Sequence, residues 1–200
     1  MFSGIVQEKG LVLLAVKSEI LKLSITVQTC IGCSIGDSIA VNGVCLTIIK
    51  IDSSKSALYF DVVFETLKKT NLELLEVNDE VNIEKSIRVG DYVGGHIVQG
   101  HIDGVGEVTN VKNESAGVIL LNIKIPFDMI KFLVAKGFVA IDGMSITIID
   151  VNDTNISVTL IPHTLEATIA NSYLAGSVVN IEVDPIGKHI HNYMEKMKGG

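Results

Sequence analysis

A nine-residue segment occurs twice in this chain, one hundred positions apart. VNGVCLTII spans residues 41–49 and IDGMSITII spans residues 141–149. Further along, the spacing becomes 98, because VNIE at 81–84 recurs as VNIE at 179–182. Similarity over this length indicates two related domains rather than a short-period solenoid, whose units are about 20–50 residues long. We therefore divide the chain into residues 1–92, residues 93–185 and a tail at 186–200.

Each copy is predicted to contain a tight β-hairpin followed by further strands. Asn42-Gly43 and Asp142-Gly143 lie between apolar runs, and such pairs tolerate the positive φ angles of a type I′ turn. Val, Ile and Leu supply most of a hydrophobic fraction of 48%, whereas aromatic residues make up only 5%. This composition, with regularly spaced turn signals, predicts a small all-β barrel or sandwich in each copy.

Three segments depart from the strand pattern. Residues 66–70 and 164–168 are predicted to form short helical turns, each begun by a capping threonine. In the tail, apolar residues recur at helical spacing and predict an amphipathic helix of about 10–12 residues, too short to be stable alone. We expect this helix to mediate oligomerisation; docking onto its own barrel is the alternative.

The acidic charge argues against nucleic acid or a membrane as a partner. Lys and Arg number 16 against 23 Asp and Glu, giving a net charge of −7, which repels phosphate backbones and anionic bilayers. The first residues lack the features of a secretory signal, and charged residues interrupt every long apolar stretch. Three cysteines, an odd number, are typical of reduced thiols. We expect a soluble cytoplasmic protein.

The strand after each hairpin turn carries a polar side chain at the same position. In a regular strand Cys45 and Thr47 point to one face, as Ser145 and Thr147 do in the second copy. A lone cysteine is usually a small buried residue. Its replacement by serine in the second copy favours a functional role instead, near a barrel rim where a ring could dock.

Two cysteines and two histidines have spacings that other kinds of site use. Cys30 and Cys33 form TCIGC, but no second pair and no βαβ context accompanies them, so we expect no metal there. His96 and His101 lie five positions apart, on opposite faces of a regular strand, which disfavours a shared metal. One of them is a candidate for proton transfer, and a structural hydrogen-bonded role is the alternative.

The glycine-rich run at 90–106 is predicted to carry the junction between the copies. It contains IVQ at 97–99, which repeats IVQ at 5–7. Gly-rich segments of the chain match neither dinucleotide-binding nor P-loop patterns, so nucleotide binding has no support. Charged residues such as Asp142 are expected to be solvated.

Eight motifs, in this order along the chain, resemble the riboflavin synthase family: MFSGIV, VNGVCLT, FETLKKTNL, VNIE, GGHIVQGHIDG, KGFVAIDGMSIT, PHTLEAT and VNIEVDP. The resemblance covers residues 1–185. It implies two tandem, similar six-stranded antiparallel Greek-key β-barrels that each bind a lumazine, followed by a C-terminal amphipathic α-helix. It also implies a homotrimer in which one subunit's N-terminal barrel faces a neighbour's C-terminal barrel.

The resemblance further implies the reaction, which is that of a transferase. Two molecules of 6,7-dimethyl-8-ribityllumazine dismutate, one donating a four-carbon unit, to give riboflavin and 5-amino-6-ribitylaminouracil, and no cofactor or metal is expected. Two similar but not identical pockets for two copies of one substrate would account for the duplication. Much of the catalysis can then come from positioning, with reactive centres held about 3–3.5 Å apart.

Matching motifs carry over the expected site residues. The first site would be lined by Gly4, Ile5, Val6, Cys45, Leu46, Thr47, Asp61, Val62, Val63, Phe64, Glu65, Thr66, Gly100, His101 and Ile102. The second would be lined by Lys136, Ser145, Ile146, Thr147, Ile161, Pro162, His163, Thr164, Leu165 and Glu166. The candidates for nucleophile activation or proton transfer are Cys45, His101, Ser145 and Thr147, with Lys136 and Asp184 as weaker ones. His163 departs from the family, which usually has a glutamate there, as Glu65 stands in the first copy.

Three other protein classes share parts of this pattern. Lumazine protein and yellow fluorescent protein resemble the family but only hold a fluorescent ligand, and they typically lose polar residues in one barrel. Here His101, Ser145 and Thr147 are in place. A flavin domain of an oxidoreductase would need an attached nicotinamide-binding module, and the sequence contains none. An OB-like nucleic-acid binder is disfavoured by charge and by scarce aromatic residues.

Overall fold

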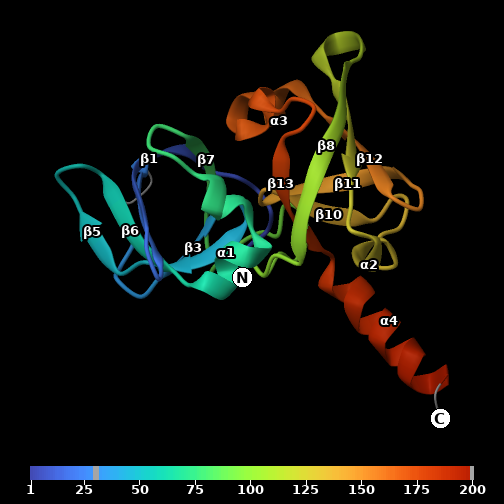
Figure 1. The fold of residues 1–200 in the computed structure, drawn as a ribbon, viewed down its shortest axis with the longest axis horizontal. Helices are drawn as coiled ribbons and strands as arrows, with labels where there is room; N and C mark the ends of the chain where they lie inside the picture. The colour runs from blue at the N-terminus through green and yellow to red at the C-terminus, as the bar shows by residue number, and fades with distance from the viewer. Residues whose placement is uncertain (29–31, 199–200) are drawn as a thin grey trace.

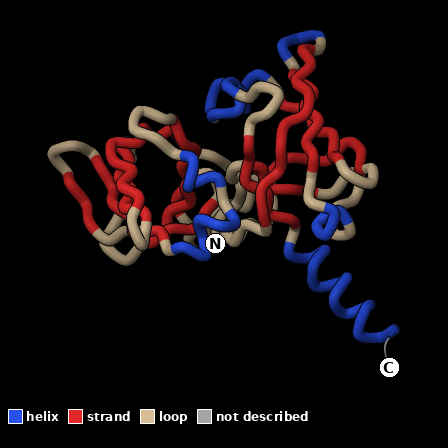
Figure 2. Tube along the Cα trace, in the orientation of Figure 1, coloured by secondary structure: helices blue, strands red, loops and turns tan. Residues whose placement is uncertain are grey.

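Two β-domains lie side by side, and a helix projects from the second (Figure 1). The structure is a computed structural model, in which residues 1–28 and 32–198 are described. Strands dominate both domains, and every helix except the last is a short segment between strands (Figure 2).

The first domain is an antiparallel sheet in the order β4-β3-β7-β1-β2-β6-β5. Its strands are β1 (Glu8–Lys17), β2 (Leu21–Thr26), β3 (Ser38–Val41), β4 (Val44–Thr47), β5 (Lys50–Asp52), β6 (Ala57–Val62) and β7 (Glu80–Lys85). Two short helices, α1 (Phe64–Lys69) and η2 (Asn71–Leu74), connect β6 to β7.

The second domain repeats this plan as a closed barrel, in the order β10-β11-β12-β9-β8-β13, with β13 pairing back onto β10. Its strands are β8 (Gly104–Asn113), β9 (Ile119–Lys124), β10 (Phe138–Ile141), β11 (Met144–Val151), β12 (Asn155–Leu160) and β13 (Val178–Val183). The connections contain η3 (Ser115–Gly117), α2 (Phe127–Ile130), α3 (Pro162–Ala167) and η4 (Ile169–Ser172).

The prediction of two tandem antiparallel barrels is confirmed, with one difference between the copies. In the second domain β11 is continuous, with a register shift between Ile148 and Asp150. Its counterpart is divided into β4 and β5 at Ile48 and Ile49, although the Ile49 N–H still donates to the Tyr59 carbonyl at 2.9 Å. The first domain is therefore a half-barrel of seven strand segments, and the second is a closed six-stranded barrel.

Side-chain alternation separates the cores from the outer faces, as the repeat predicts. Val44, Leu46 and Ile48 point into the first core and are at most 6% exposed. Their counterparts in β11 are buried in the second core: Met144, Ile146 and Ile148. Each domain thus has its own apolar core. Full burial of one such side chain stabilises the folded state by about 1.5–3 kcal/mol.

The two hairpin turns of the repeat contact each other at the seam between the domains. Asn42, Gly43, Asp142 and Gly143 all have φ angles between 42° and 82°, which confirms the predicted type I′ turns. A Cβ added to Gly43 would lie 2.6 Å from the Gly143 nitrogen, and one added to Gly143 would lie 2.8 Å from the Gly43 nitrogen. Only glycine allows the turns to approach this closely.

Two asparagines of the repeated VNIE motif join the domains across this seam. Asn82 Nδ2 donates to the Asp142 carbonyl at 2.9 Å, and Asn180 Nδ2 donates to the Asn42 carbonyl at 2.8 Å. Both amides are buried and hydrogen-bonded, as buried polar groups must be. Each contact has a counterpart with the domains exchanged, so the seam has approximate twofold symmetry.

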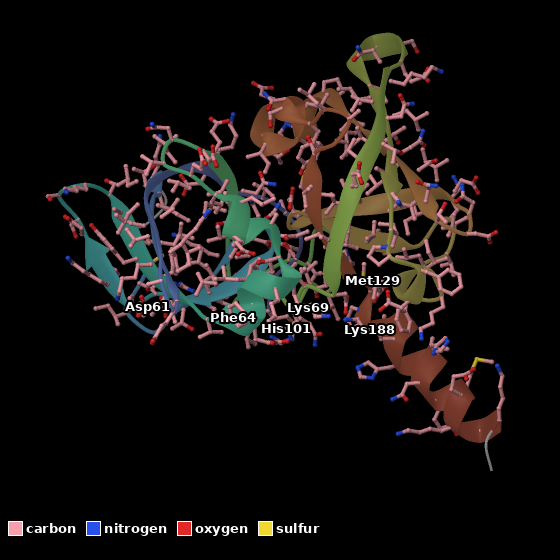
Figure 3. All side chains as sticks on the ribbon, in the orientation of Figure 1. Asp61, Phe64, Lys69, His101, Met129 and Lys188 are labelled. Carbon is pink, nitrogen blue, oxygen red and sulfur yellow. The ribbon has the colours of Figure 1, made fainter. Side chains whose placement is uncertain are left out.

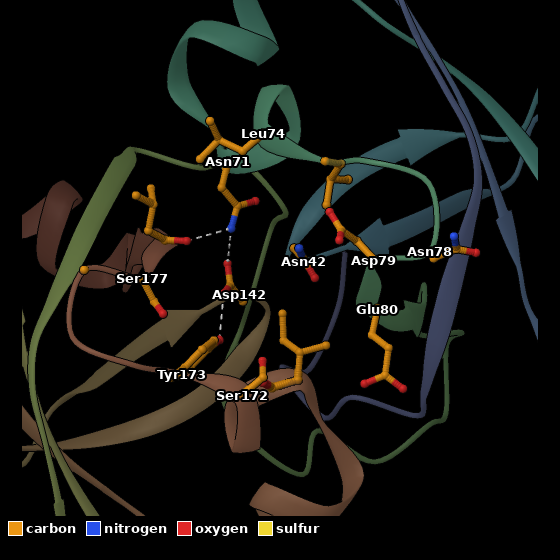
Figure 4. Close-up of a pocket in the computed structure, with 14 residues that line it drawn as sticks. Asn42, Asn71, Leu74, Asn78, Asp79, Glu80, Asp142, Ser172, Tyr173 and Ser177 are labelled. Atoms are coloured by element: carbon orange, nitrogen blue, oxygen red, sulfur yellow. Dashed lines mark hydrogen bonds between the residues drawn. The ribbon is translucent and has the colours of Figure 1, made fainter.

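Asp142 is buried in this seam, so the expectation of a solvated carboxylate was wrong (Figure 4). The carboxylate accepts from the Tyr173 hydroxyl at 2.6 Å, from Asn71 Nδ2 at 3.0 Å and from the Asn180 N–H at 2.7 Å. The side chain is 1% exposed, at the edge of a pocket that Asn71, Ser172 and Tyr173 also line. Burial raises the pKa of Asp142 to about 7, and the three hydrogen bonds oppose the shift.

The short helices begin earlier than predicted. α1 begins at Phe64, and its N-cap Val63 offers no capping side chain. Thr66 is therefore inside the helix rather than at its start. Thr70 instead caps the following η2, where its hydroxyl accepts from the Leu72 N–H. The α3 and η4 helices repeat this arrangement in the second domain.

The predicted C-terminal helix is confirmed, and it is slightly longer than expected. Helix α4 spans Pro185–Lys198 and extends away from both domains (Figure 1). Ile186, Ile190, Met194 and Met197 are each between 54% and 66% exposed. These side chains form an exposed apolar stripe along the helix. Among the described residues, no helix is long and apolar enough to cross a membrane.

Candidate functional site

An extended segment before each barrel crosses the seam and lies against the other domain. The Ser145 N–H donates to the Gly4 carbonyl at 2.8 Å, and the Cys45 N–H donates to the Gly100 carbonyl at 2.9 Å. The segment at 2–6 therefore precedes the first barrel but contacts the second. The segment at 98–102 precedes the second barrel but contacts the first.

Glu84, near the end of β7, holds the first crossing segment. Its buried carboxylate accepts from the Ser3 N–H at 2.7 Å, the Ser3 hydroxyl at 2.9 Å and the Gly4 N–H at 3.1 Å. Burial raises the pKa of Glu84, and these donors oppose the shift. The Glu84 carboxylate thus takes the place of the backbone carbonyls that would accept from these N–H groups in a strand pair.

Glu182, on β13, holds the second crossing segment in the same way. Its carboxylate accepts from the N–H groups of Gln99, Gly100 and His101 at 2.7, 2.8 and 3.0 Å. Burial again raises the pKa, opposed by these backbone donors and by the charge of Lys188. Both glutamates belong to the repeated VNIE motif, to which the sequence analysis assigned no role.

The crossing segments are equivalent, but not in the register that the IVQ repeat indicated. Gly4 and Gly100 make the same contacts, and Phe2 and Val98 pair with each other across the seam, with N–H···O distances of 2.7 and 3.1 Å. FSGIV at 2–6 therefore corresponds to VQGHI at 98–102. The resemblance implies that Gly4, Ile5 and Val6 line the first site, whereas in the structure Gly4 lies beside Ser145 and Val6 packs against the second core.

The first cradle is a cavity of about 240 Å³ beside Cys45. It brings together six residues expected in the first site: Cys45, Glu65, Thr66, Gly100, His101 and Ile102. Lys69 and Thr70 also line it, although sequence reasoning missed them. Their signal was their place in the motif FETLKKTNL, one helical turn after Glu65 and Thr66. Figure 3 labels Lys69, the last residue of α1, and His101 next to it.

We call the equivalent surface around Ser145 in the second domain the second cradle, and there Ser145 has a histidine partner. Its Oγ lies 2.6 Å from His96 Nδ1. The His96 ring is 7% exposed and stacks on Phe138 with centroids 5.2 Å apart. Burial lowers the pKa of His96, and the charge of Asp184 opposes the shift. A neutral imidazole at this distance can accept the serine proton.

His96 and His101 thus serve different cradles, and neither lies in a regular strand. The sequence predicts a catalytic role for His101 and does not distinguish His96. The glycine pair before His96 was the available signal, because a Cβ on Gly95 would lie 2.5 Å from the Ser145 Cβ. Among the described residues, His96 Nε2 is buried and has no hydrogen-bond partner.

The expected residues of the strands divide between the barrel cores and the outer faces. Leu46, Val62 and Ile146 are buried in the barrel cores, which leaves only their backbone for a ligand. Thr47 and Thr147 lie on the outer faces of β4 and β11 and are exposed. The catalytic candidates of each strand are therefore on the outer face, as the alternation predicts.

Lys136 has a backbone conformation that lysine rarely adopts. Its φ is 67°, whereas its counterpart Gly36 has a φ of 95°. The Lys136 N–H donates to the Ile148 carbonyl at 2.8 Å, and the Gly36 N–H donates to the equivalent Ile48 carbonyl at 2.9 Å. A non-glycine residue in the left-handed region costs on the order of 1–3 kcal/mol, and such strain clusters at functional sites. The exposed Lys136 amine therefore stays a candidate.

The remaining expected residues lie in the segments that lead into and form α1 and α3. Asp61 forms an ion pair with Lys22 on the surface of β6, with the two charged atoms 3.6 Å apart. Asp61 and Phe64 are both labelled in Figure 3. The exposed members are Asp61, Val63, Phe64, Glu65, Ile161, Pro162, His163 and Glu166. The half-buried members are Thr66, Thr164 and Leu165.

No group of three or more His, Cys, Asp or Glu side chains that could hold a metal occurs in residues 1–28 and 32–198. Cys33 and Cys45 are free thiols. Cys30, the other cysteine of TCIGC, lies outside the described residues.

Comparison with known proteins gives a consistent result. The family model for the lumazine binding domain matches residues 3–86 and again residues 99–184. Riboflavin synthase of Bacillus amyloliquefaciens is 38% identical, over 98% of this chain and 91% of that protein. Riboflavin synthase of Bacillus subtilis is 36% identical over the same shares.

A solved structure is also similar in fold. The crystal structure of LumP complexed with 6,7-dimethyl-8-(1'-D-ribityl) lumazine matches with a TM-score of 0.82 and 30% sequence identity. The match covers 92% of this chain and 99% of that one.

Proposed function

This chain belongs to the riboflavin synthase family, and we propose that its two cradles together carry out the family's reaction. One 6,7-dimethyl-8-ribityllumazine donates a four-carbon unit to a second, which gives riboflavin and 5-amino-6-ribitylaminouracil. The chain is thus a transferase. The near full-length similarity to riboflavin synthases and the double occurrence of the lumazine binding domain support this function.

Two equivalent cradles with different side chains are the feature that best supports the proposal. The Gly4–Ser145 and Gly100–Cys45 hydrogen bonds give both cradles the same backbone frame. Two molecules of one substrate need such a shared frame. They also need different chemistry, since one molecule gives the four-carbon unit and the other receives it.

We assign proton abstraction to the second cradle. The 7-methyl group of the lumazine is unusually acidic, and Ser145 with His96 forms the paired hydroxyl and imidazole that can remove its proton. In the first cradle Cys45 and His101 line the same cavity and are the proposed nucleophile and proton-transfer groups. Thr147 and Lys136 are proposed to bind the substrate at the second cradle, with Asp184 near His96.

We also propose a homotrimer in which one subunit's N-terminal barrel faces a neighbour's C-terminal barrel. The first cavity, of about 240 Å³, is smaller than the roughly 300–1,000 Å³ typical of ligand pockets. Three apolar side chains at the starts of α1 and α3, Val63, Phe64 and Ile161, are more than half exposed, and we propose that they form the rim of the cradles. A neighbouring barrel would enclose the ligand and cover this rim. Residues 1–92 and 93–185 are then the lumazine-binding units, and residues 186–200 the trimerisation helix.

The assay that tests the function uses the lumazine alone. The purified protein should convert 6,7-dimethyl-8-ribityllumazine to riboflavin, with two lumazines consumed for each riboflavin formed, measured by fluorescence and chromatography. A protein that binds the lumazine and returns it unchanged would contradict the proposal and favour a role in binding alone; LumP has been crystallised in complex with this lumazine. We propose the cytoplasm as the location, where the free thiols Cys33 and Cys45 would stay reduced.

The trimer predicts a clear effect of changes in α4. Deleting residues 186–200, or the single change Ile190→Glu, should lower the mass measured by sedimentation, because both remove the exposed apolar stripe from the subunit contact. Asn192→Glu adds the same charge at an exposed polar position of the helix and should leave the mass unchanged. An unchanged mass after the deletion would refute the helix assignment.

A further inference from the structure

We propose that Glu84 and Glu182 are positioning residues that act across the seam, so that each barrel's glutamate fixes a wall of the other barrel's cradle. The description of those cradles as lumazine sites rests on the proposed function. The hydrogen-bonded connections themselves do not.

The connection from Glu182 begins in the second barrel and ends in the first. Its carboxylate holds three successive N–H groups, those of Gln99, Gly100 and His101. The Gly100 carbonyl then accepts from the Cys45 N–H at 2.9 Å. Gly100, His101 and the next residue line the cavity beside Cys45. A carboxylate of β13 therefore sets the position of a wall in the first cradle.

The connection from Glu84 runs in the opposite direction. Its carboxylate, on β7 of the first domain, holds the Ser3 and Gly4 N–H groups. The Gly4 carbonyl accepts from the Ser145 N–H at 2.8 Å, and a Cβ on Gly4 would lie 2.6 Å from the Ser145 Cβ. Val6 continues the segment and packs against the second core. This glutamate therefore sets a wall of the cradle that holds Ser145.

Each carboxylate satisfies donors that have no strand partner at these positions. A glutamine has one acceptor oxygen and one NH₂ group, so it would present a donor to at least one of the backbone N–H groups. Hydrogen bonds to charged groups are the stronger ones, and a buried donor left unmade is costly. Glu→Gln should therefore loosen the crossing segment while it keeps the size of the side chain.

Amide hydrogen exchange in the full chain, resolved by NMR, tests this arrangement independently of activity. Glu182→Gln should speed exchange of the Cys45 amide about tenfold or more, since that amide relies on the Gly100 carbonyl. The Ser145 amide should stay within about twofold. Glu84→Gln should give the reverse pattern. Glu80→Gln, at an exposed position on β7, is the matched control and should leave both amides unchanged.

Three results would overturn the proposal. Each glutamine variant could affect the amide of its own barrel, or affect both amides equally, or affect neither. If Glu182→Gln does not fold, Glu182→Asp keeps the charge on a shorter side chain and should give the same pattern to a smaller extent. If the exchange pattern holds but the natural chain neither binds nor converts the lumazine, the positioning is supported and the proposed function fails.

Discussion

Replacing Ser145 with alanine should lower kcat for lumazine dismutation by about 10²- to 10⁴-fold, the range that a positioned acid–base group supplies. The change removes the only side-chain oxygen that lies within hydrogen-bond distance, 2.6 Å, of His96 Nδ1 in the described residues. Removing a group that acts only in the transition state lowers kcat and kcat/KM equally, so KM should change little. Steady-state kinetics at saturating and limiting lumazine measure both quantities.

Two controls separate this role from simple loss of structure. Ser145→Cys places the first cradle's side chain in the second and should retain part of the activity. His96→Asn keeps an atom near the position of Nδ1 but cannot act as a base, and should resemble Ser145→Ala. If the pair acts as a unit, the double variant should be no slower than either single variant. Full activity of Ser145→Ala would remove the assignment.

Replacing Asp142 with asparagine should abolish a pH-dependent loss of stability. The pKa of Asp142 is about 7 in the folded chain, against an ordinary value of 3.8. Between these values the folded state holds more protons than the unfolded state, so the free energy of unfolding falls as pH rises. The fall is about 1.4 kcal/mol per pH unit in this window and stops above pH 7. Stability that Asp142 contributes at low pH is thus lost by pH 8.

Urea denaturation at pH 5 and pH 8 measures this effect. The free energy of unfolding of Asp142→Asn, relative to that of the natural chain, should rise by about 3 kcal/mol from pH 5 to pH 8. Asn42 is the natural control, since it occupies the same turn position in the first domain as an amide. Asn42→Asp should make stability more pH-dependent. The residue equivalent to Tyr173 in the first domain is Leu75, which has no hydroxyl to donate to the new carboxylate and oppose the rise of its pKa. An unchanged pH dependence in Asp142→Asn would show that Asp142 is ionised in the fold at low cost.

The architecture could be predicted from sequence because its signals are local. The Asn-Gly and Asp-Gly turns fix two positive φ angles each, and the strand after each turn alternates between core and outer face. These patterns gave the duplicated domains, the buried side chains of Val44 and Leu46, and the outward position of Cys45. The apolar spacing of the tail likewise gave helix α4.

The arrangement of the sites could not be predicted, because it depends on contacts between distant parts of the chain. A match of three letters, IVQ, suggested a register that the Phe2–Val98 pairing does not follow. The crossing places Gly4 at the other domain's cradle, and no local pattern reports such an exchange. Nor does the sequence show that His96 rather than His101 approaches Ser145.

The contact between Gly43 and Gly143 has a consequence for how the two halves can diverge. Because neither of these glycine positions has room for a side chain, a methyl group added at either one would push the barrels apart and shift every group on one side of their boundary relative to the other side. Substitutions elsewhere, such as serine for cysteine, alter reactivity while leaving that separation untouched. The doubled chain can therefore specialise its halves chemically, while one glycine pair keeps their relative placement constant.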